Sequence, residues 1–592
     1  MCAARSATAI STSMGFGARG HDGGGAGRGG GVVIGDATHG TLVEAKRLLA
    51  RQASDPAVVA AAALSPYTLA HSETGHPLYE TAHGGTLRRY PPEYVLGAVL
   101  ARLRAMAEAQ LGVCVTEAVI VTPTVWSHAQ LLALEDAASL AGVTVVRQVS
   151  ETTAVALHDM FTQWREDSGE VLTAVVTVGA GWCNAAVVTV EDHVVEVKSV
   201  ASAMVGGADL VRRLMRHCLT AFVTRHGGVD ASGSVRAMKR LRTACECALR
   251  TLCAASSVTV DVDALHSERD LSVVVTREQL SALCAEDVAT MGGVVETALR
   301  LARVAPAAIQ RLLVTGGCSR LPQVQAAVRS AVGGREPVRG MDVETSAVLG
   351  CAVMAAAMSR ACTARGTRGK LDEMLCLEAT PTSLGVETGG GVFTRLVPRN
   401  TTYPTRKCHT FTTHTDGQTA MLVRVFEGEG AMCRDCTLVG EMRLDGVPAA
   451  ARGTVEVEVT MDMDGSRTTW VRAEVKGSGG GGASKAMLLS CERTRLTVVD
   501  VERLSAEARL LATECEAVRA ANASRVALEA RSFAARAAAA RLPVESARAA
   551  VMRAAEATLR WLEREGEGAD VATLVVQWGA LERTLAPHCE AM

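Results

Sequence analysis

The chain has 592 residues, of which 48% are hydrophobic and 21% are charged, and its formal net charge is -2. At roughly 150 residues per domain, this length accommodates three or four units with separate cores, so a single small module is excluded. The near-neutral charge gives no electrostatic support for binding nucleic acid or an anionic membrane surface. We expect neither among the partners.

Cysteine usage and hydropathy indicate the compartment. The longest apolar stretch, residues 347–358, is shorter than the ~20 residues of a membrane-crossing helix. The 18 cysteines form no evenly spaced framework, which favours a reducing, cytoplasmic location. We read Cys433 and Cys436 as unrelated thiols and expect no metal ligands, a zinc or redox site being the alternative. Residues 1–31 are glycine-rich and predict a disordered tail, with an organellar leader as the alternative.

Residues 32–363 alternate short β-branched runs with helical ones, which is typical of α/β layers. A strand is predicted at 117–122, and Ser127 with Gln130 forms a capping box for a helix through Leu140. Strands at 174–178 and 185–190 flank Gly179-Ala180-Gly181 at hairpin spacing.

A further strand, 312–315, ends at Gly316-Gly317, and Pro322 is suited to the first position of a helix. This order of strand, glycine turn and helix is suited to receiving a phosphate or a sugar.

The composition changes after residue 363, and we assign 364–379 to an interdomain linker with a polar start at 361–370. Residues 380–495 alternate as in a β-sandwich, with a glycine loop at 479–482. Residues 496–592 have helical periodicity, which Pro543 and Gly566–Gly568 divide into at least three helices. Thr497 and Asp500 are expected to cap the first of these helices.

Several long motifs name a family. VETGGGVFTRLVPRNTTYPTRKCHTFTTHTDGQTAMLVRV at 386–425 closely resembles the peptide-binding domain of the seventy-kilodalton heat-shock chaperones. RRYPPEYVLGAVLARLRAMAEAQLG, AMKRLRTACECALRTL and LLVTGGCSRLPQVQ resemble the nucleotide-binding domain of the same family. The resemblance runs from about Val32 to the end of the chain.

The resemblance implies a multidomain protein. It has an actin-like, two-lobed α/β nucleotide-binding domain (32–363), a β-sandwich peptide-binding domain (380–495) and an α-helical lid (496–592). Such chaperones bind ATP or ADP with Mg²⁺, unfolded polypeptide clients, J-domain co-chaperones and exchange factors. The family's first glycine-threonine phosphate loop has no counterpart here, so the nucleotide-binding domain is expected to lack its first strands. An upstream exon missing from the gene model would restore that loop.

The family's second phosphate loop, DLGGGTFD, is altered in this sequence. It reads Thr177-Val178-Gly179-Ala180-Gly181-Trp182-Cys183-Asn184, so both aspartates are absent and an indole replaces the threonine hydroxyl. Mg²⁺ prefers carboxylate and water oxygens, and losing one preorganised electrostatic group can cost ~10²- to 10³-fold in rate. We therefore expect weak or no ATP hydrolysis. The alternative reading of this hairpin is a plain turn that binds no ligand.

Other nucleotide positions persist by resemblance. Lys46 matches the lysine that reaches the phosphates, and Glu151 matches the acid near the metal. The alternative reading of Lys46 is a solvated lysine on a helix. Ala208 replaces an acid, and Leu249 and Cys253 replace a lysine and a serine at the adenosine side. Glu246 and Arg250 are either nucleoside contacts or an i,i+4 surface pair. The remaining expected nucleotide contacts are Gly179, Gly181, Gly206, Gly207, Gly316, Gly317, Arg320 and Glu344. Weak binding without turnover and no binding at all both remain open.

The peptide side matches the family better. By resemblance, a groove for an extended apolar segment is lined by Val386, Phe411, Met421, Val423 and Val457, with Gly389 and His414 at the arch over it. The alternative role of these apolar residues is sandwich core. Pro123 matches the family's switch proline, whereas Leu131 replaces its arginine partner, so we expect impaired communication between domains.

These features favour a stress-response chaperone that holds apolar client segments as a pseudo-ATPase. The alternative is a fully ATP-dependent folding chaperone that works with J-domain and exchange-factor partners.

Overall fold

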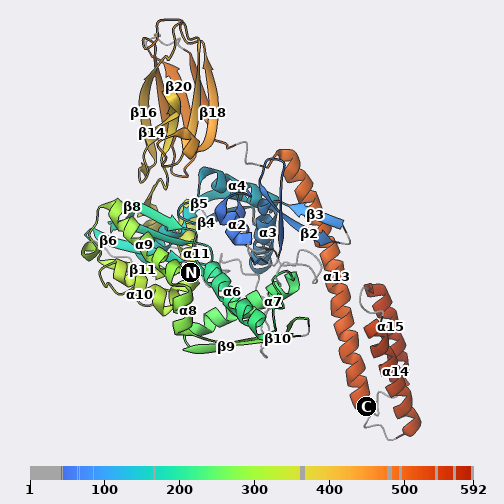
Figure 1. The fold of residues 1–592 in the computed structure, drawn as a ribbon. Helices are drawn as coiled ribbons and strands as arrows, with labels where there is room; N and C mark the ends of the chain where they lie inside the picture. The colour runs from blue at the N-terminus through green and yellow to red at the C-terminus, as the bar shows by residue number, and fades with distance from the viewer. Residues whose placement is uncertain are drawn as a thin grey trace. The chain divides into compact units, whose positions relative to one another are not determined.

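The computed structural model describes residues 42–587 except 43, 63, 66, 84–85, 164–168, 268, 360–366, 477–482, 492–495, 540–543 and 565–568. The predicted tail 1–31, the glycine loop 479–482, Pro543 and Gly566–Gly568 lie outside the described residues. The structure divides into two compact units, residues 1–497 and 498–592 (Figure 1). No helix in the described part is long and apolar enough to cross a membrane.

The described residues between 45 and 162 of unit 1 form two small sheets and five helices. A three-stranded antiparallel sheet has the order β1-β2-β3, and β4 pairs in parallel with β5. The elements are α1 (Ala45–Leu48), α2 (Pro56–Ala62), β1 (Thr68–His71), β2 (Pro77–His83), β3 (Thr86–Tyr90), α3 (Pro92–Leu111), β4 (Glu117–Thr122), α4 (His128–Leu140), β5 (Thr144–Ser150) and α5 (Glu151–Thr162). The predicted strand at 117–122 and the Ser127–Gln130 capping box that opens α4 are both confirmed.

A six-stranded mixed sheet with the order β11-β6-β7-β8-β12-β15 forms the centre of unit 1. The following elements build it and flank it: β6 (Val171–Val178), β7 (Cys183–Glu191), β8 (Val194–Ala203), α6 (Gly207–Arg225), α7 (Val235–Leu252), β9 (Ser257–His266), β10 (Arg269–Thr276), α8 (Arg277–Leu283), α9 (Ala285–Ala302), β11 (Arg311–Thr315), α10 (Pro322–Ala331), α11 (Ser346–Met358), α12 (Thr367–Glu373), β12 (Leu375–Ala379) and β15 (Thr402–Tyr403). Short 3₁₀ turns, η1 (Pro306–Ala308) and η2 (Gly317–Arg320), flank β11. The predicted β6–β7 hairpin, the strand at β11 and the helix starting at Pro322 are confirmed.

The central sheet is buried on both faces. Ala174, Val176 and Val178 of β6 contribute to a core with α6, α7, α9 and α10, whereas Val175 faces the core formed with α5. This two-sided burial explains why β6 is an almost continuous apolar run. On the α5 side, Gly350 of α11 lies so close to α5 that a Cβ atom there would lie 1.7 Å from the Ala154 carbonyl oxygen.

The linker differs from its prediction as a polar connector. Residues 367–373 form α12, and Leu375–Ala379 form β12, which pairs in parallel with β8. An edge strand presents unpaired backbone groups that a neighbouring segment can satisfy. The five residues of β12 are too few for their pattern to predict this strand.

The sandwich that was predicted for 380–495 is present as two antiparallel four-stranded sheets, β14-β13-β17-β18 and β16-β19-β20-β21. Its elements are β13 (Leu384–Thr388), η3 (Gly389–Gly391), β14 (Val392–Val397), β16 (Thr405–Thr412), β17 (Ala420–Glu427), η4 (Cys433–Asp435), β18 (Thr437–Asp445), β19 (Glu456–Met463), β20 (Thr469–Val475) and β21 (Ser484–Leu488). One apolar core joins the two sheets, with Val425 and Val439 from the first and Val459 and Val471 from the second.

The described residues of unit 2 form three helices, α13 (Val498–Ala539), α14 (Glu545–Arg564) and α15 (Val571–Leu585), in agreement with the predicted helical periodicity. Its core includes Leu528, Val551 and Leu574. An ion pair of 2.7 Å joins Arg531 of α13 to Glu582 of α15.

Candidate functional site

A cavity of about 510 Å³ lies among α1, the β6–β7 turn, the start of α6, α7 and the turn after β11. Most of the sequence-predicted nucleotide residues meet there: Lys46, Glu151, Thr177, Gly179, Gly181, Trp182, Gly207, Glu246, Arg250, Gly316, Gly317, Arg320 and Glu344. Gly206 precedes the lining residue Gly207, and Asn184 is fully buried beside the cavity. Residues distant in the sequence therefore converge on one space.

The carboxylate of Glu151 is bound by neutral donors of the chain. Thr177 Oγ1 donates to Glu151 Oε2 at 3.1 Å, and Asn184 Nδ2 donates to the same oxygen at 2.9 Å. The Asn184 oxygen faces the other way, accepting from Ser202 Oγ at 2.7 Å and from the Thr124 N–H at 3.3 Å. Its amide nitrogen is therefore the group that points toward Glu151.

These residues do not fit the Mg²⁺ that accompanies ATP in the resembling family. Mg²⁺ takes oxygen ligands in near-octahedral geometry, whereas Thr177 and Asn184 direct donor hydrogens at the carboxylate that remains. Among the described residues, no group of three or more His, Cys, Asp or Glu side chains could hold a metal ion. Of the lining carboxylates that the structure describes, Glu151 is the one that is not paired with an arginine.

Lys46 and Glu151 are poorly solvated groups of opposite charge that influence each other's pKa without forming a direct ion pair. Burial lowers the pKa of Lys46, and the charge of Glu151 opposes this shift. Burial raises the pKa of Glu151, and Lys46, Thr177 and Asn184 oppose that shift. Because the Glu151 pKa is raised, its contribution to stability is present at low pH and is lost as pH rises through the folded-state pKa. The Lys46 contribution is present above its ordinary pKa and is lost as pH falls. Near neutral pH, both groups cost stability, which is typical of residues kept for binding.

The β6–β7 turn lines the cavity and contains backbone N–H groups that are not used within the fold. The N–H groups of Ala180, Gly181 and Trp182 donate to no acceptor among the described residues. By contrast, Gly207 N–H donates to the Gly179 oxygen at 3.0 Å, and Ala208 N–H donates to the Ala180 oxygen at 2.9 Å. The turn, and not the start of α6, is thus where an anion finds free N–H groups.

Trp182 lines the cavity, but its indole is largely buried against residues that precede β6 in the sequence. It is 7% exposed, and its ring lies edge-on to Trp126 with centroids 6.2 Å apart. Leu49 and Leu134 share the same apolar cluster. The Arg47 guanidinium lies 5.9 Å from the indole centroid. The residue that replaces the expected threonine therefore joins the β6–β7 turn to a separate core cluster.

A buried ion network, missed by sequence reasoning, closes one side of the cavity. Arg47 is 2% exposed and donates to Asp209 Oδ2 at 2.5 Å and to the Gly181 oxygen at 2.8 Å. Glu44 pairs with Arg47 at 3.4 Å and with Arg242 at 2.7 Å, and Arg212 contacts both Glu44 and Asp209. Burial alone would lower the pKa of Arg47, but the hydrogen bond to Asp209 and the charges of Glu44 and Asp209 raise it above its ordinary value. The spacing of these arginines and acids in the sequence did not predict the network, because arginine is the usual cation throughout this chain.

Glu246 and Arg250, the two residues expected at the adenosine side, do not pair with each other. Glu246 pairs with Arg242 at 3.1 Å, and the alternative Glu246–Arg250 ion pair is not present among the described residues. The reason is that Arg242 lies one turn earlier on α7, where it also reaches Glu44. Arg320 pairs with Glu344 at 2.7 Å on the exposed rim.

The predicted peptide residues lie in the sandwich at two depths. Val386, Val423 and Val457 belong to its buried core, whereas Phe411 and Met421 are only partly buried against that core. At the end where β13 and β16 terminate, a Cβ atom on Gly389 would lie 4.0 Å from His414 Nδ1, so the two arch residues are neighbours. Cys433 and Cys436 are free thiols, with Cys433 packed among Phe393 and Phe426.

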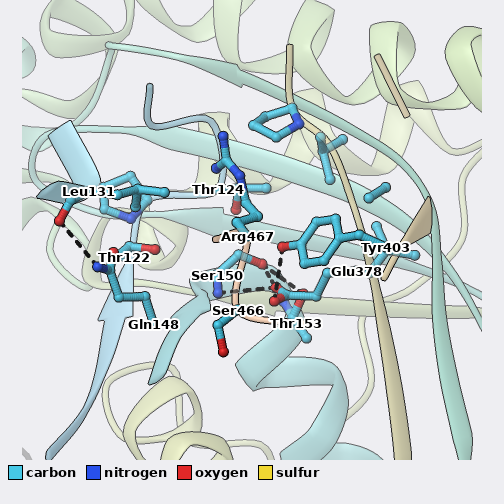
Figure 2. Close-up of a pocket in the computed structure, with 15 residues that line it drawn as sticks. Thr122, Thr124, Leu131, Gln148, Ser150, Thr153, Glu378, Tyr403, Ser466 and Arg467 are labelled. Carbon is cyan, nitrogen blue, oxygen red and sulfur yellow. Dashed lines mark hydrogen bonds between the residues drawn. The ribbon is translucent and has the colours of Figure 1, made fainter. Parts of the chain in front are cut away.

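A smaller cavity of about 30 Å³, with room for a few water molecules at most, lies beside Leu131 and Glu378 (Figure 2). Pro123 and Leu131 line it together with Glu378 at the end of the linker strand. Glu378 accepts hydrogen bonds from the Ser150 N–H at 3.3 Å and from Tyr403 Oη at 3.2 Å. Leu131 offers this carboxylate no charge.

Comparison with known proteins agrees with this arrangement. A family model described as Hsp70 protein matches residues 31–592. Heat shock 70 kDa protein 2 of Paracoccidioides lutzii is 34% identical over 478 residues, which cover 81% of this chain and 71% of the relative. A heat shock 70 kDa protein of Emericella nidulans is 34% identical over 82% of this chain and 75% of its own length. Heat shock cognate 70 kDa protein 3 of Dictyostelium discoideum is 32% identical over 79% of this chain and 73% of its own length. The chain therefore belongs to the Hsp70 family of heat-shock chaperones.

Proposed function

We propose that this Hsp70-family chaperone holds exposed apolar segments of unfolded proteins with weak or no turnover of ATP. Members of the family combine a nucleotide-binding domain, a substrate-binding domain and a helical lid, and they bind ATP or ADP with Mg²⁺. The observation that carries the proposal is the Glu151 carboxylate, which Thr177 and Asn184 bind where the family loop has two aspartates. Phosphoryl transfer depends on positioned cations and a held water.

Client capture is proposed at the end of the sandwich where β13 and β16 terminate. Phe411 of β16 and Met421 of β17 come from opposite sheets, and both lie at the margin of the apolar core. An extended apolar segment needs backbone hydrogen bonds and an apolar pocket. Gly389 and His414 lie at the same end and are proposed to form the arch.

A fully ATP-dependent folding chaperone is the second candidate function. The retained cavity favours it, because Lys46 lines the cavity together with three backbone N–H groups of the β6–β7 turn that have no acceptor in the described part of the chain. In that case J-domain and exchange-factor partners would control the cycle. Leu131 beside Glu378, without the expected arginine, argues for weaker coupling between cavity and sandwich.

Changing Phe411 to Asp is expected to weaken client binding about tenfold or more. Burying a phenylalanine side chain contributes ~1.5–3 kcal/mol, and each 1.4 kcal/mol is about a factor of ten in affinity. The measurement is the concentration that halves aggregation of a denatured client without nucleotide. The control is Leu422→Asp, because Leu422 is 47% exposed beside Met421 on the same strand. Both variants are checked for native circular dichroism. Equal protection by wild type and Phe411→Asp would contradict capture at this end.

A further inference from the structure

The charges that line the large cavity are mostly paired with one another. Arg47 and Arg242 bind Glu44, Asp209 and Glu246, and Arg320 binds Glu344. Lys46 and Arg250 have no ion pair with a described residue, and Glu151 is the single lining carboxylate outside these pairs. The unpaired lining charge is therefore net positive.

The hydrogen-bond donors of the cavity point to an anionic ligand. The Ala180–Trp182 turn presents three N–H groups that have no acceptor among the described residues, and Lys46 lines the same space. Successive N–H groups in a turn form an anion-binding concavity. In the turn after β11, a Cβ atom on Gly317 would have nothing within 4 Å, so the backbone there is open to a ligand, whereas Gly316 packs against the Val178 backbone.

The same cavity has lost the means to bind a divalent cation. Thr177 and Asn184 are neutral and direct hydrogens at Glu151. Relative to the DLGGGTFD loop, these two substitutions remove two negative charges. A Mg²⁺ ion carries two positive charges, so the loss of both aspartates together with the ion leaves the charge balance around the phosphates unchanged.

We propose that this cavity binds a nucleoside di- or triphosphate without a divalent cation, its phosphates held by the Ala180–Trp182 turn and by Lys46. The inference rests on the proposed loss of turnover and extends it by naming the form of the ligand. Lys46 neutralises phosphate charge in place of the cation, and the poor solvation of its ammonium strengthens that attraction. Arg250 is available to the nucleoside end.

The test is titration of the full chain with a fluorescent N-methylanthraniloyl derivative of ATP or ADP, in EDTA and in excess Mg²⁺. We expect the dissociation constant in EDTA to equal that in Mg²⁺ within about twofold, or to be lower, since Mg²⁺ competes for the free phosphate charge. Binding that weakens tenfold or more in EDTA would overturn the proposal. Failure to bind in either condition would overturn it as well.

Lys46→Met is expected to weaken binding in EDTA about tenfold or more, whereas Lys198→Met is expected to change nothing. Lys198 lies on β8, is paired with Glu196 and does not line the cavity. An unchanged affinity for folded Lys46→Met would contradict the assigned phosphate contact, and the EDTA comparison on wild type stands independently of any variant. Client holding is measured without nucleotide, so failure of the proposed function and failure of this inference are distinguishable.

Discussion

Arg47→Ala is expected to lower the free energy of unfolding by about 3–5 kcal/mol, because breaking a buried ion pair leaves an uncompensated charge. The side chain is 2% exposed and binds Asp209, Glu44 and the Gly181 carbonyl oxygen. Its removal leaves three acids of the network, Glu44, Asp209 and Glu246, with two arginines, Arg212 and Arg242. Denaturant unfolding followed by tryptophan fluorescence measures the loss, with Trp182 next to the substitution as reporter.

A surface ion pair provides the matched control for Arg47. Arg443 pairs with Asp445 at 2.7 Å, and both side chains are about two-thirds exposed. Arg443→Ala is expected to cost at most about 1 kcal/mol, as exposed pairs do. A loss below about 1 kcal/mol for Arg47→Ala would show that the buried network does not stabilise this part of the fold.

Asn184→Asp is expected to destabilise the protein by about 3 kcal/mol or more at pH 8. The residue is fully buried, and its Nδ2 lies 2.9 Å from Glu151 Oε2, so the substitution places two carboxyl groups against each other. Two carboxyls in one site cannot both ionise cheaply, and one pKa is raised strongly. A raised folded-state pKa contributes stability at low pH that is lost as pH rises. The destabilisation is therefore expected to be smaller at pH 5 than at pH 8.

Asn400→Asp controls for the amide-to-carboxylate change. Asn400 Oδ1 accepts from the Val200 N–H at 3.2 Å, and an aspartate oxygen can accept the same bond. Its positive φ of 61° is tolerated by aspartate. We expect a change below about 1 kcal/mol for this control at both pH values. A pH-independent loss for Asn184→Asp would contradict a charge clash with Glu151.

Local signals in the sequence predicted those parts of the fold that depend on residues a few positions apart. The Ser127–Gln130 capping box, the hairpin around Gly179–Gly181 and the helix start at Pro322 are present as expected. The linker strand β12 was missed, because it exists through pairing with β8, which lies far away in the sequence. Short edge strands of this kind depend on tertiary contacts more than on their own residues.

In the candidate site too, some features could be predicted from the sequence and others depend on contacts in the folded chain. Family resemblance identified the residues that line the cavity, but the arrangement of their charges is a property of the folded chain. Glu44, Asp209 and Arg242 acquire their roles through pairs that span well over a hundred residues. The direction of the Asn184 amide likewise depends on Ser202 and Thr124, which no local motif places there.

The most direct test of the central claim is release of inorganic phosphate from γ-labelled ATP by the full chain with Mg²⁺ and a J-domain protein. Because Glu151 is the one lining carboxylate in the described chain that is not paired with an arginine, and Thr177 and Asn184 donate hydrogen bonds to it, we predict a rate indistinguishable from that of Lys46→Ala. A rate equal to that of an active Hsp70, abolished by Lys46→Ala, would contradict the claim.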